Sequence, residues 1–166
     1  MAKAQGRNNC HLFTPDDQAL ALHRSELEWT ARIRAALAED RLFLCVYPMV
    51  AIGGRVDAPA MAEVLLHMRA PNGQIIMPRA FIPAAERSGL MSTVDRWVMR
   101  AVVQYIAQHP DDQTLYCINL SGTSVGDPAF CAHIEAVLKS FGTDPRWVCF
   151  EISETIAIAY PPTSAR

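Results

Sequence analysis

A short apolar segment with a carboxylate inside it places the strongest constraint on how this chain can fold. Residues Met61 to Arg69 read MAEVLLHMR, and prolines bound the segment at Pro59 and Pro71. This length and these boundaries predict a buried β-strand. Glu63 lies within the segment, and an unpaired buried carboxylate is costly. We therefore expect Glu63 to have a metal ion, a cation or a hydrogen-bond donor as its partner.

Strand and helix signals alternate along the rest of the chain. The order from the second expected strand onward is strand, helix, strand, helix, strand, which implies parallel strands joined by right-handed crossovers. Pro48 cannot donate to a ladder, so its end of the first strand is expected at an edge, a bend or a terminus. We expect strands over 42–50, 62–68, 115–120 and 147–152, helices over 18–40, 92–109 and 127–141, turns at 53–54 and 71–73, and over 78–89 a loop with a short helical piece from Pro83.

The last of these helices has signals at both ends. Asp127-Pro128 resembles an N-cap followed by proline at the first helical position. Gly142 follows the last apolar residue of the pattern and is expected to end the helix.

Side chains alternate across a strand with period two, so each expected strand can be divided into two faces. Two carboxylates and one amide carbonyl on neighbouring strands would suit a hard divalent cation, and phosphodiester hydrolysis is a usual reaction at such a site. The alternative is that these are unrelated polar residues near strand ends, satisfied by the backbone or by water. The predicted shared faces are Glu63, Leu65 and His67; Cys117, Asn119 and Ser121; and Cys149, Glu151 and Ser153.

Composition excludes several classes of protein. The chain has 166 residues, of which 51% are hydrophobic and 19% charged, as in a single globular domain. A net charge of −2 without a basic run argues against binding DNA through its phosphates. No apolar run approaches the ~20 residues of a membrane span, and residues 1–9 lack the apolar region of a signal peptide. We therefore expect a cytoplasmic domain, whose parent protein could be membrane-anchored, with its five cysteines reduced.

Several sequence blocks, in this order, resemble the EAL domain family of cyclic-di-GMP phosphodiesterases. They are EWTARIRAAL, the strand with Pro48, EVLLHM, PRAFIPAAERSGLMSTVDRWVM, INLSG and FEISET. The resemblance implies that residues 18–166 are a partial EAL domain and that residues 1–17 are the end of a GGDEF domain. It implies an α/β fold, namely a TIM-like (β/α) barrel truncated to about its first half, with four strands of which the first is antiparallel. An unrelated half-barrel that merely shares these motifs is a further interpretation.

The resemblance also implies a reaction and a set of residues for it. Mg²⁺ or Mn²⁺ would activate a water that attacks one phosphodiester of cyclic-di-GMP and gives linear pGpG. By motif match, Glu63, Asn119 and Glu151 correspond to metal ligands, and Glu63 and Glu151 thereby to catalytic residues. Glu154 corresponds to a glutamate that supports the neighbouring catalytic loop. The residues implied at the nucleotide are Tyr47, Leu65, His67, Phe81, Ile82, Pro83 and Glu86.

Two of these positions depart from the family pattern. Tyr47 stands where the family has a glutamine, and His67 stands where it has an arginine that clamps a phosphate. Arginine presents a fixed fork of donors that histidine cannot reproduce. Each of the two residues also has a plain interpretation as a packing residue.

The family's paired aspartates, catalytic lysine, later metal-binding glutamate and glutamine have no counterpart here, so we expect this chain alone to be catalytically inactive. The alternative is a degenerate EAL module that serves as a cyclic-di-GMP receptor or a protein-interaction domain. A half barrel has two open strand edges and an uncovered inner face. We therefore expect a homodimer, or association with the missing half through those edges.

Overall fold

Helices and strands alternate in the order that the sequence predicts. The computed structural model describes residues 18–52 and 59–159, so the expected tail over 1–17 and turn at 53–54 lie outside the described residues. The elements are α1 (Gln18–Ala38), β1 (Leu42–Met49), β2 (Met61–Arg69), β3 (Ile75–Ile76), α2 (Pro78–Arg87), α3 (Met91–Gln108), β4 (Leu115–Asn119), α4 (Gly122–Val125), α5 (Pro128–Phe141), a 3₁₀ turn (Pro145–Trp147), β5 (Val148–Glu151) and α6 (Glu154–Ala159).

The strands form one mixed sheet in the order β1-β2-β4-β5. β1 runs antiparallel to β2, whereas β2, β4 and β5 are parallel to one another, which confirms the predicted directions of the four strands. The sequence did not predict β3, a two-residue strand that pairs with the end of β2 across the turn at 71–74. The architecture is therefore α/β, with a mixed sheet of five strands and helices.

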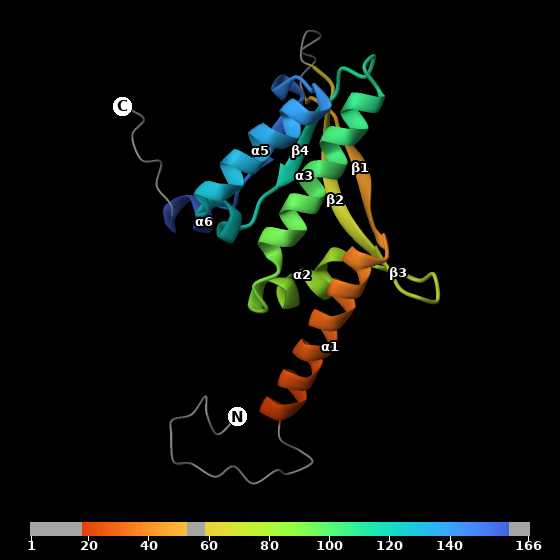
Figure 1. The fold of residues 1–166 in the computed structure, drawn as a ribbon, viewed down its shortest axis with the longest axis vertical. Coiled ribbons are helices and arrows are strands. Elements are labelled where there is room, and N and C mark those ends of the chain that lie inside the picture. The colour runs from red at the N-terminus through yellow and green to blue at the C-terminus, as the bar shows by residue number, and fades with distance from the viewer. Residues whose placement is uncertain (1–17, 53–58, 160–166) are drawn as a thin grey trace.

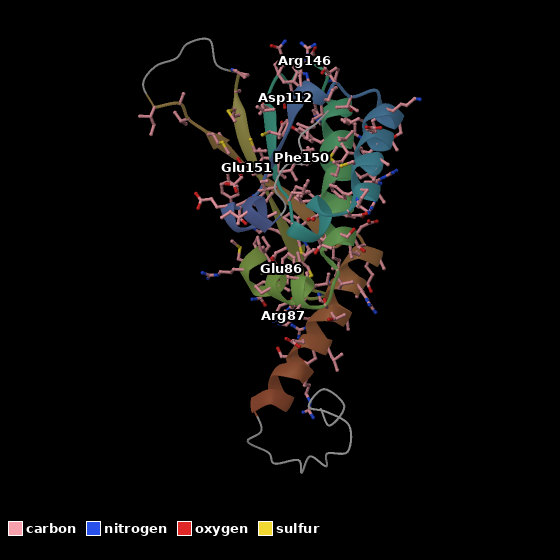
Figure 2. All side chains as sticks on the ribbon, turned by 90° about the vertical axis from the view of Figure 1, so that its left-hand side faces the viewer. Glu86, Arg87, Asp112, Arg146, Phe150 and Glu151 are labelled. Carbon is pink, nitrogen blue, oxygen red and sulfur yellow. The ribbon has the colours of Figure 1, made fainter. Side chains whose placement is uncertain are left out.

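The hydrophobic core lies between the sheet and the helices α3 and α5, which cover the same side of the sheet (Figure 1, Figure 2). Alternate residues of β2 are buried in it, namely Ala62, Val64 and Leu66, as the period of a strand requires. α3 contributes residues with helical spacing, such as Val94 and Val98. The opposite face of β2 is thereby left to Glu63 and Leu65.

The segment 78–89 differs from its prediction. It was expected to be a loop with a short helical piece from Pro83, but α2 begins at Pro78 and contains Pro83 in its interior. Pro78 occupies the start of the helix, where a backbone N–H has no intrahelical partner and proline is favoured. Phe81, Ala84 and Ala85 are buried on one side of α2. Burial of that face outweighs the cost of an interior proline, about 3 kcal/mol.

Within residues 18–52 and 59–159, none of the helices combines the length and the apolar character that a bilayer crossing demands.

Candidate functional site

Two glutamates and an asparagine lie on the face of the sheet opposite α3 and α5. Glu63 of β2 pairs with Cys117 of β4, and Asn119 of β4 pairs with Glu151 of β5. Paired residues of parallel strands point to the same side, and so do residues two apart on one strand. Glu63, Asn119 and Glu151 therefore share one face.

The side chain of Asn119 connects this group. Its Nδ2 donates a hydrogen bond to Glu63 Oε1 at 3.0 Å, which supplies Glu63 with the partner that the sequence required. The backbone N–H of Leu120 donates to the carbonyl oxygen of Glu151 at 2.9 Å, so the ends of β4 and β5 are fixed to each other beside the two side chains. Glu63 and Glu151 are half-buried and Asn119 is exposed.

Asn119 and Glu151 lie where β4 and β5 end, whereas Glu63 lies near the start of the longer strand β2. Figure 2 shows Asp112 and Arg146, which precede β4 and β5, at one end of the molecule, Glu86 of α2 toward the other, and Glu151 between them. Asn119 and Glu151 are the last residues of their strands. In α/β folds with parallel strands, ligands bind at the carboxyl ends of the strands. The position therefore suits a binding site.

A hollow of about 360 Å³ opens at this position. Its lining includes Asn119 and Glu151, which the resemblance implied as metal ligands. It also includes Leu65, Ile82 and Glu86, which the resemblance implied at the nucleotide. One hollow of the size of a small-molecule site thus brings together residues from β2, α2, α3, β4 and β5, and it extends from the Asn119 and Glu151 end of the strands to the α3 side of the sheet.

Other residues of the predicted set lie outside the lining of this hollow. Phe81 is fully buried in the core. Pro83 and Glu154 are exposed, on α2 and at the start of α6. Tyr47 of β1 pairs with Glu63 and is 47% exposed. Glu63 and His67 are the other predicted residues that do not line the hollow.

His67 has the environment of a packed residue. It is only 3% exposed, and its ring stacks on that of Phe43, with 5.5 Å between the ring centroids. Its Nδ1 lies 3.2 Å from the carbonyl oxygen of Leu65. These contacts support the packing interpretation of His67 over contact with a phosphate.

Asp95 of α3 is a structural part of the site that sequence reasoning missed. It is 4% exposed, and its Oδ2 accepts hydrogen bonds from Ser121 N at 3.2 Å, Ser121 Oγ at 2.5 Å and Ser124 Oγ at 2.7 Å. These bonds fix the loop that follows Asn119. The only signal in the sequence is a carboxylate beside Val94 in the apolar stripe of α3.

The donor set fits a hard divalent cation. Carboxylate and amide oxygens are the ligands that Mg²⁺ prefers, and Mg²⁺ keeps several waters beside one or two carboxylates. A half-turn of the Asn119 amide exchanges its nitrogen for its oxygen. Over residues 18–52 and 59–159, no group of three or more His, Cys, Asp or Glu side chains could hold a metal ion.

A buried thiol, that of Cys117, lies beside Glu63 and Asn119. Burial first, and then the nearby Cys149 thiol and the Glu151 carboxylate, raise the pKa of the Cys117 thiol to about 11. Cys117 is therefore a neutral thiol at pH 7, and the negative charge of this face comes from its carboxylates.

Comparison with known proteins shows the family of this chain. The family model described as "EAL domain" matches residues 30–165. Cyclic di-GMP phosphodiesterase PdeB of Shewanella oneidensis is 36% identical over 159 residues, which are 95% of this chain and 18% of that protein. Cyclic di-GMP phosphodiesterase PdeF of Escherichia coli is 30% identical over 129 residues, 76% of this chain and 17% of that protein.

A solved structure gives the same result. The EAL domain of FimX from Pseudomonas aeruginosa, bound to c-di-GMP, superposes with a TM-score of 0.73 at 31% identity, covering 80% of this chain and 53% of that chain. The chain thus spans less than a fifth of the two curated relatives and about half of this solved domain. With a family model that matches most of its length, the chain belongs to the EAL domain family.

Proposed function

We propose that this chain supplies the first part of an EAL-type phosphodiesterase domain that converts cyclic-di-GMP to pGpG. The observation that carries the proposal is the hydrogen bond between Asn119 and Glu63, with Glu151 on the same face beside the hollow. The names of the relatives PdeB and PdeF, and the c-di-GMP bound to the FimX domain, support the choice of substrate.

Glu63, Asn119 and Glu151 would hold Mg²⁺ or Mn²⁺. When bound, such an ion supplies an activated water and stabilises charge on the phosphate. Asn119 orients the Glu63 carboxylate through their hydrogen bond. Asp95 keeps the loop after β4 in place through the hydroxyl groups of Ser121 and Ser124. We assign to Glu154, at the start of α6, the support of a neighbouring catalytic loop.

The nucleotide would lie along the hollow between the sheet and α2. Leu65 and Ile82 present apolar surface to it, and the exposed carboxylate of Glu86 can accept hydrogen bonds from N–H groups of a base. Tyr47, beside Glu63, offers a half-exposed ring. Phe81 acts indirectly, because its buried ring fixes α2 to the core, and Pro83 shapes that helix.

The sheet would be the first half of a TIM-like barrel. Its order leaves β1 and β5 as edges over the described residues, and the chain covers 53% of the FimX EAL domain. Open edges pair readily with other strands. We propose that β1 and β5 associate with a second copy or with a complementary half barrel, and that the isolated 166-residue chain does not turn over substrate.

A second candidate function is that of a cyclic-di-GMP receptor. The buried position of His67 favours a module without catalysis, because His67 packs on Phe43 and has no donor fork to clamp a phosphate for attack. A receptor needs the hollow but not the metal ligands.

Calorimetric titration of cyclic-di-GMP with and without Mn²⁺, together with a hydrolysis assay, tests these proposals. The phosphodiesterase proposal predicts metal-dependent binding, weakened by Glu63→Gln but not by Glu135→Gln, an exposed control on α5. An affinity for cyclic-di-GMP that is unchanged by Mn²⁺ and by Glu63→Gln would favour the receptor. Turnover by the wild-type chain would contradict the predicted inactivity, and absence of binding at high micromolar ligand would remove both functions for this chain.

A further inference from the structure

Two cysteines face each other across neighbouring strands of the candidate site. Cys117 of β4 pairs directly with Cys149 of β5 in parallel register. Adjacent strands lie about 4.8 Å apart, and a disulfide spans Cα–Cα distances of about 4.4–6.8 Å. The two thiols have no part in the proposed reaction.

The two thiols differ in exposure. Cys117 is fully buried, whereas Cys149 is half-buried and makes only a weak contact with the carbonyl oxygen of Phe150, at 3.9 Å. A small reagent therefore reaches Cys149 first, with Cys117 opposite it on the neighbouring strand. Two other cysteines are described, and neither is paired with a cysteine in the sheet. Cys131 is exposed on α5, and Cys45 of β1 pairs with Leu65 of β2.

We infer that Cys117 and Cys149 form an oxidisable dithiol, which a peroxide converts to a disulfide between β4 and β5. Hydrogen peroxide first oxidises the Cys149 thiol to a sulfenic acid and is itself reduced to water. The Cys117 sulfur then attacks the Cys149 sulfur and the S–S bond forms. The sulfenic oxygen leaves as a second water, with its own proton and the proton of the Cys117 thiol. Reversible cross-links of this kind are typical of redox-sensing proteins in reducing compartments.

The cross-link would act on the metal ligands. Asn119 and Glu151 lie two residues beyond Cys117 and Cys149 on the same face. A disulfide requires a Cβ–Cβ separation of about 3.5–4.5 Å, shorter than the spacing of the strands. It would draw the two strands together and change the positions of Asn119 and Glu151 relative to Glu63, so oxidation should weaken Mn²⁺ binding. This last step rests on the proposed function, whereas formation of the cross-link does not.

Peptide mapping after peroxide treatment tests the inference. The folded 166-residue chain is treated with hydrogen peroxide, alkylated with iodoacetamide and digested without reductant. We expect one linked peptide pair that contains Cys117 and Cys149 and disappears on reduction. Cys131→Ser should leave that pair unchanged, and Cys149→Ser should abolish it. Phenylarsine oxide, which bridges adjacent thiols with loss of water, should protect the same two cysteines from alkylation.

Two results would overturn the inference: separate alkylation of Cys117 and Cys149 after peroxide, or linkage of either one to another cysteine or to another chain. Cys149→Ser is preferred to a change at the buried Cys117, because it is less apt to disturb folding, and circular dichroism verifies the fold. Mn²⁺ titration of reduced and oxidised protein then separates the two proposals. If the reduced protein binds no Mn²⁺, the proposed metal site is contradicted, but the proposed dithiol is not.

Discussion

Asn119 connects the two carboxylates of the candidate site. It donates to Glu63 through its side chain and pairs with Glu151 through the register of β4 and β5. Because its side chain is exposed, its amide can turn its oxygen toward an ion without disturbing the core. The chemistry proposed for this chain therefore depends on the orientation of the Asn119 side chain.

The stability of the protein is expected to depend on pH through His133 of α5. Its Nε2 is buried without a hydrogen-bond partner among the described residues. Burial, followed by the charges of Arg96 and Arg100, lowers the pKa of His133 below its usual value of 6.5. As pH falls through 6.5, the unfolded chain takes up this proton more readily than the folded chain does, so stability is lost.

Thermal unfolding at pH 7 and pH 5 tests this expectation with His133→Gln. The wild type should lose more stability between the two pH values than the variant, since glutamine does not titrate. An equal loss in both proteins would show that His133 makes no contribution to the acid sensitivity.

At the scale of elements, the sequence predicted β2, α3 and α5 to within a residue or two of their ends, because their apolar residues recur with the period of a strand or a helix. It predicted only the part of α2 from Pro83 onward, since Pro83 interrupts the local signal and burial against the core favours the full helix. β3 has two residues, too few to show the alternating pattern of a strand.

The candidate site was predictable only in part. Period two placed Glu63, Asn119 and Glu151 on one face once their strands were known. The role of Asp95 was not predictable, since its partners Ser121 and Ser124 lie far along the chain. The burial of His67 depends on its pairing with Phe43 across β1 and β2, which no local pattern specifies.

Asp95→Ala should destabilise the protein by about 2–4 kcal/mol, because the backbone N–H of Ser121 and two hydroxyl groups lose their acceptor. Urea unfolding measures the loss. Asp111→Ala, at an exposed position, should change stability by less than about 0.5 kcal/mol. Equal effects of the two changes would contradict the structural role of Asp95.

The end of α5 gives a second test at this scale. Gly142 caps the helix in a left-handed conformation, with φ of +65°, and no atom lies within 4 Å of the position that a Cβ would take. Gly142→Ala should therefore cost about 1–2 kcal/mol from backbone strain alone. Gly126→Ala, at a φ of −81°, should not cost this amount. Chemical denaturation of both variants compares them, and a greater loss at Gly126 would be contrary to this account.

At the scale of the whole molecule, the sheet ends in two edges over the described residues, β1 and β5. Val46, Met49 and Val50 are exposed along and just beyond β1. Exposed apolar residues on a strand edge favour pairing with another chain. The edges of the sheet are therefore suited to pair with another chain.

Size-exclusion chromatography with light scattering tests this expectation. The chain should elute as a dimer or larger assembly, above its monomer mass of 18.4 kDa. Val46→Lys should shift the population toward the monomer, because a charge on an edge strand opposes pairing. A wild-type chain that stays at 18.4 kDa across micromolar concentrations would contradict the proposed association.

The most direct test of the metal site is a Mn²⁺ titration followed by electron paramagnetic resonance, in which bound Mn²⁺ loses the signal of the free ion. The reduced wild-type chain should bind Mn²⁺. Glu63→Gln keeps the acceptor for Asn119 but removes the charge, and it should weaken binding by at least roughly tenfold, the loss that even outer partners of a metal site cause. Equal Mn²⁺ binding by wild type and Glu63→Gln, or none by the wild type, would contradict the assignment of Glu63, Asn119 and Glu151 as metal ligands.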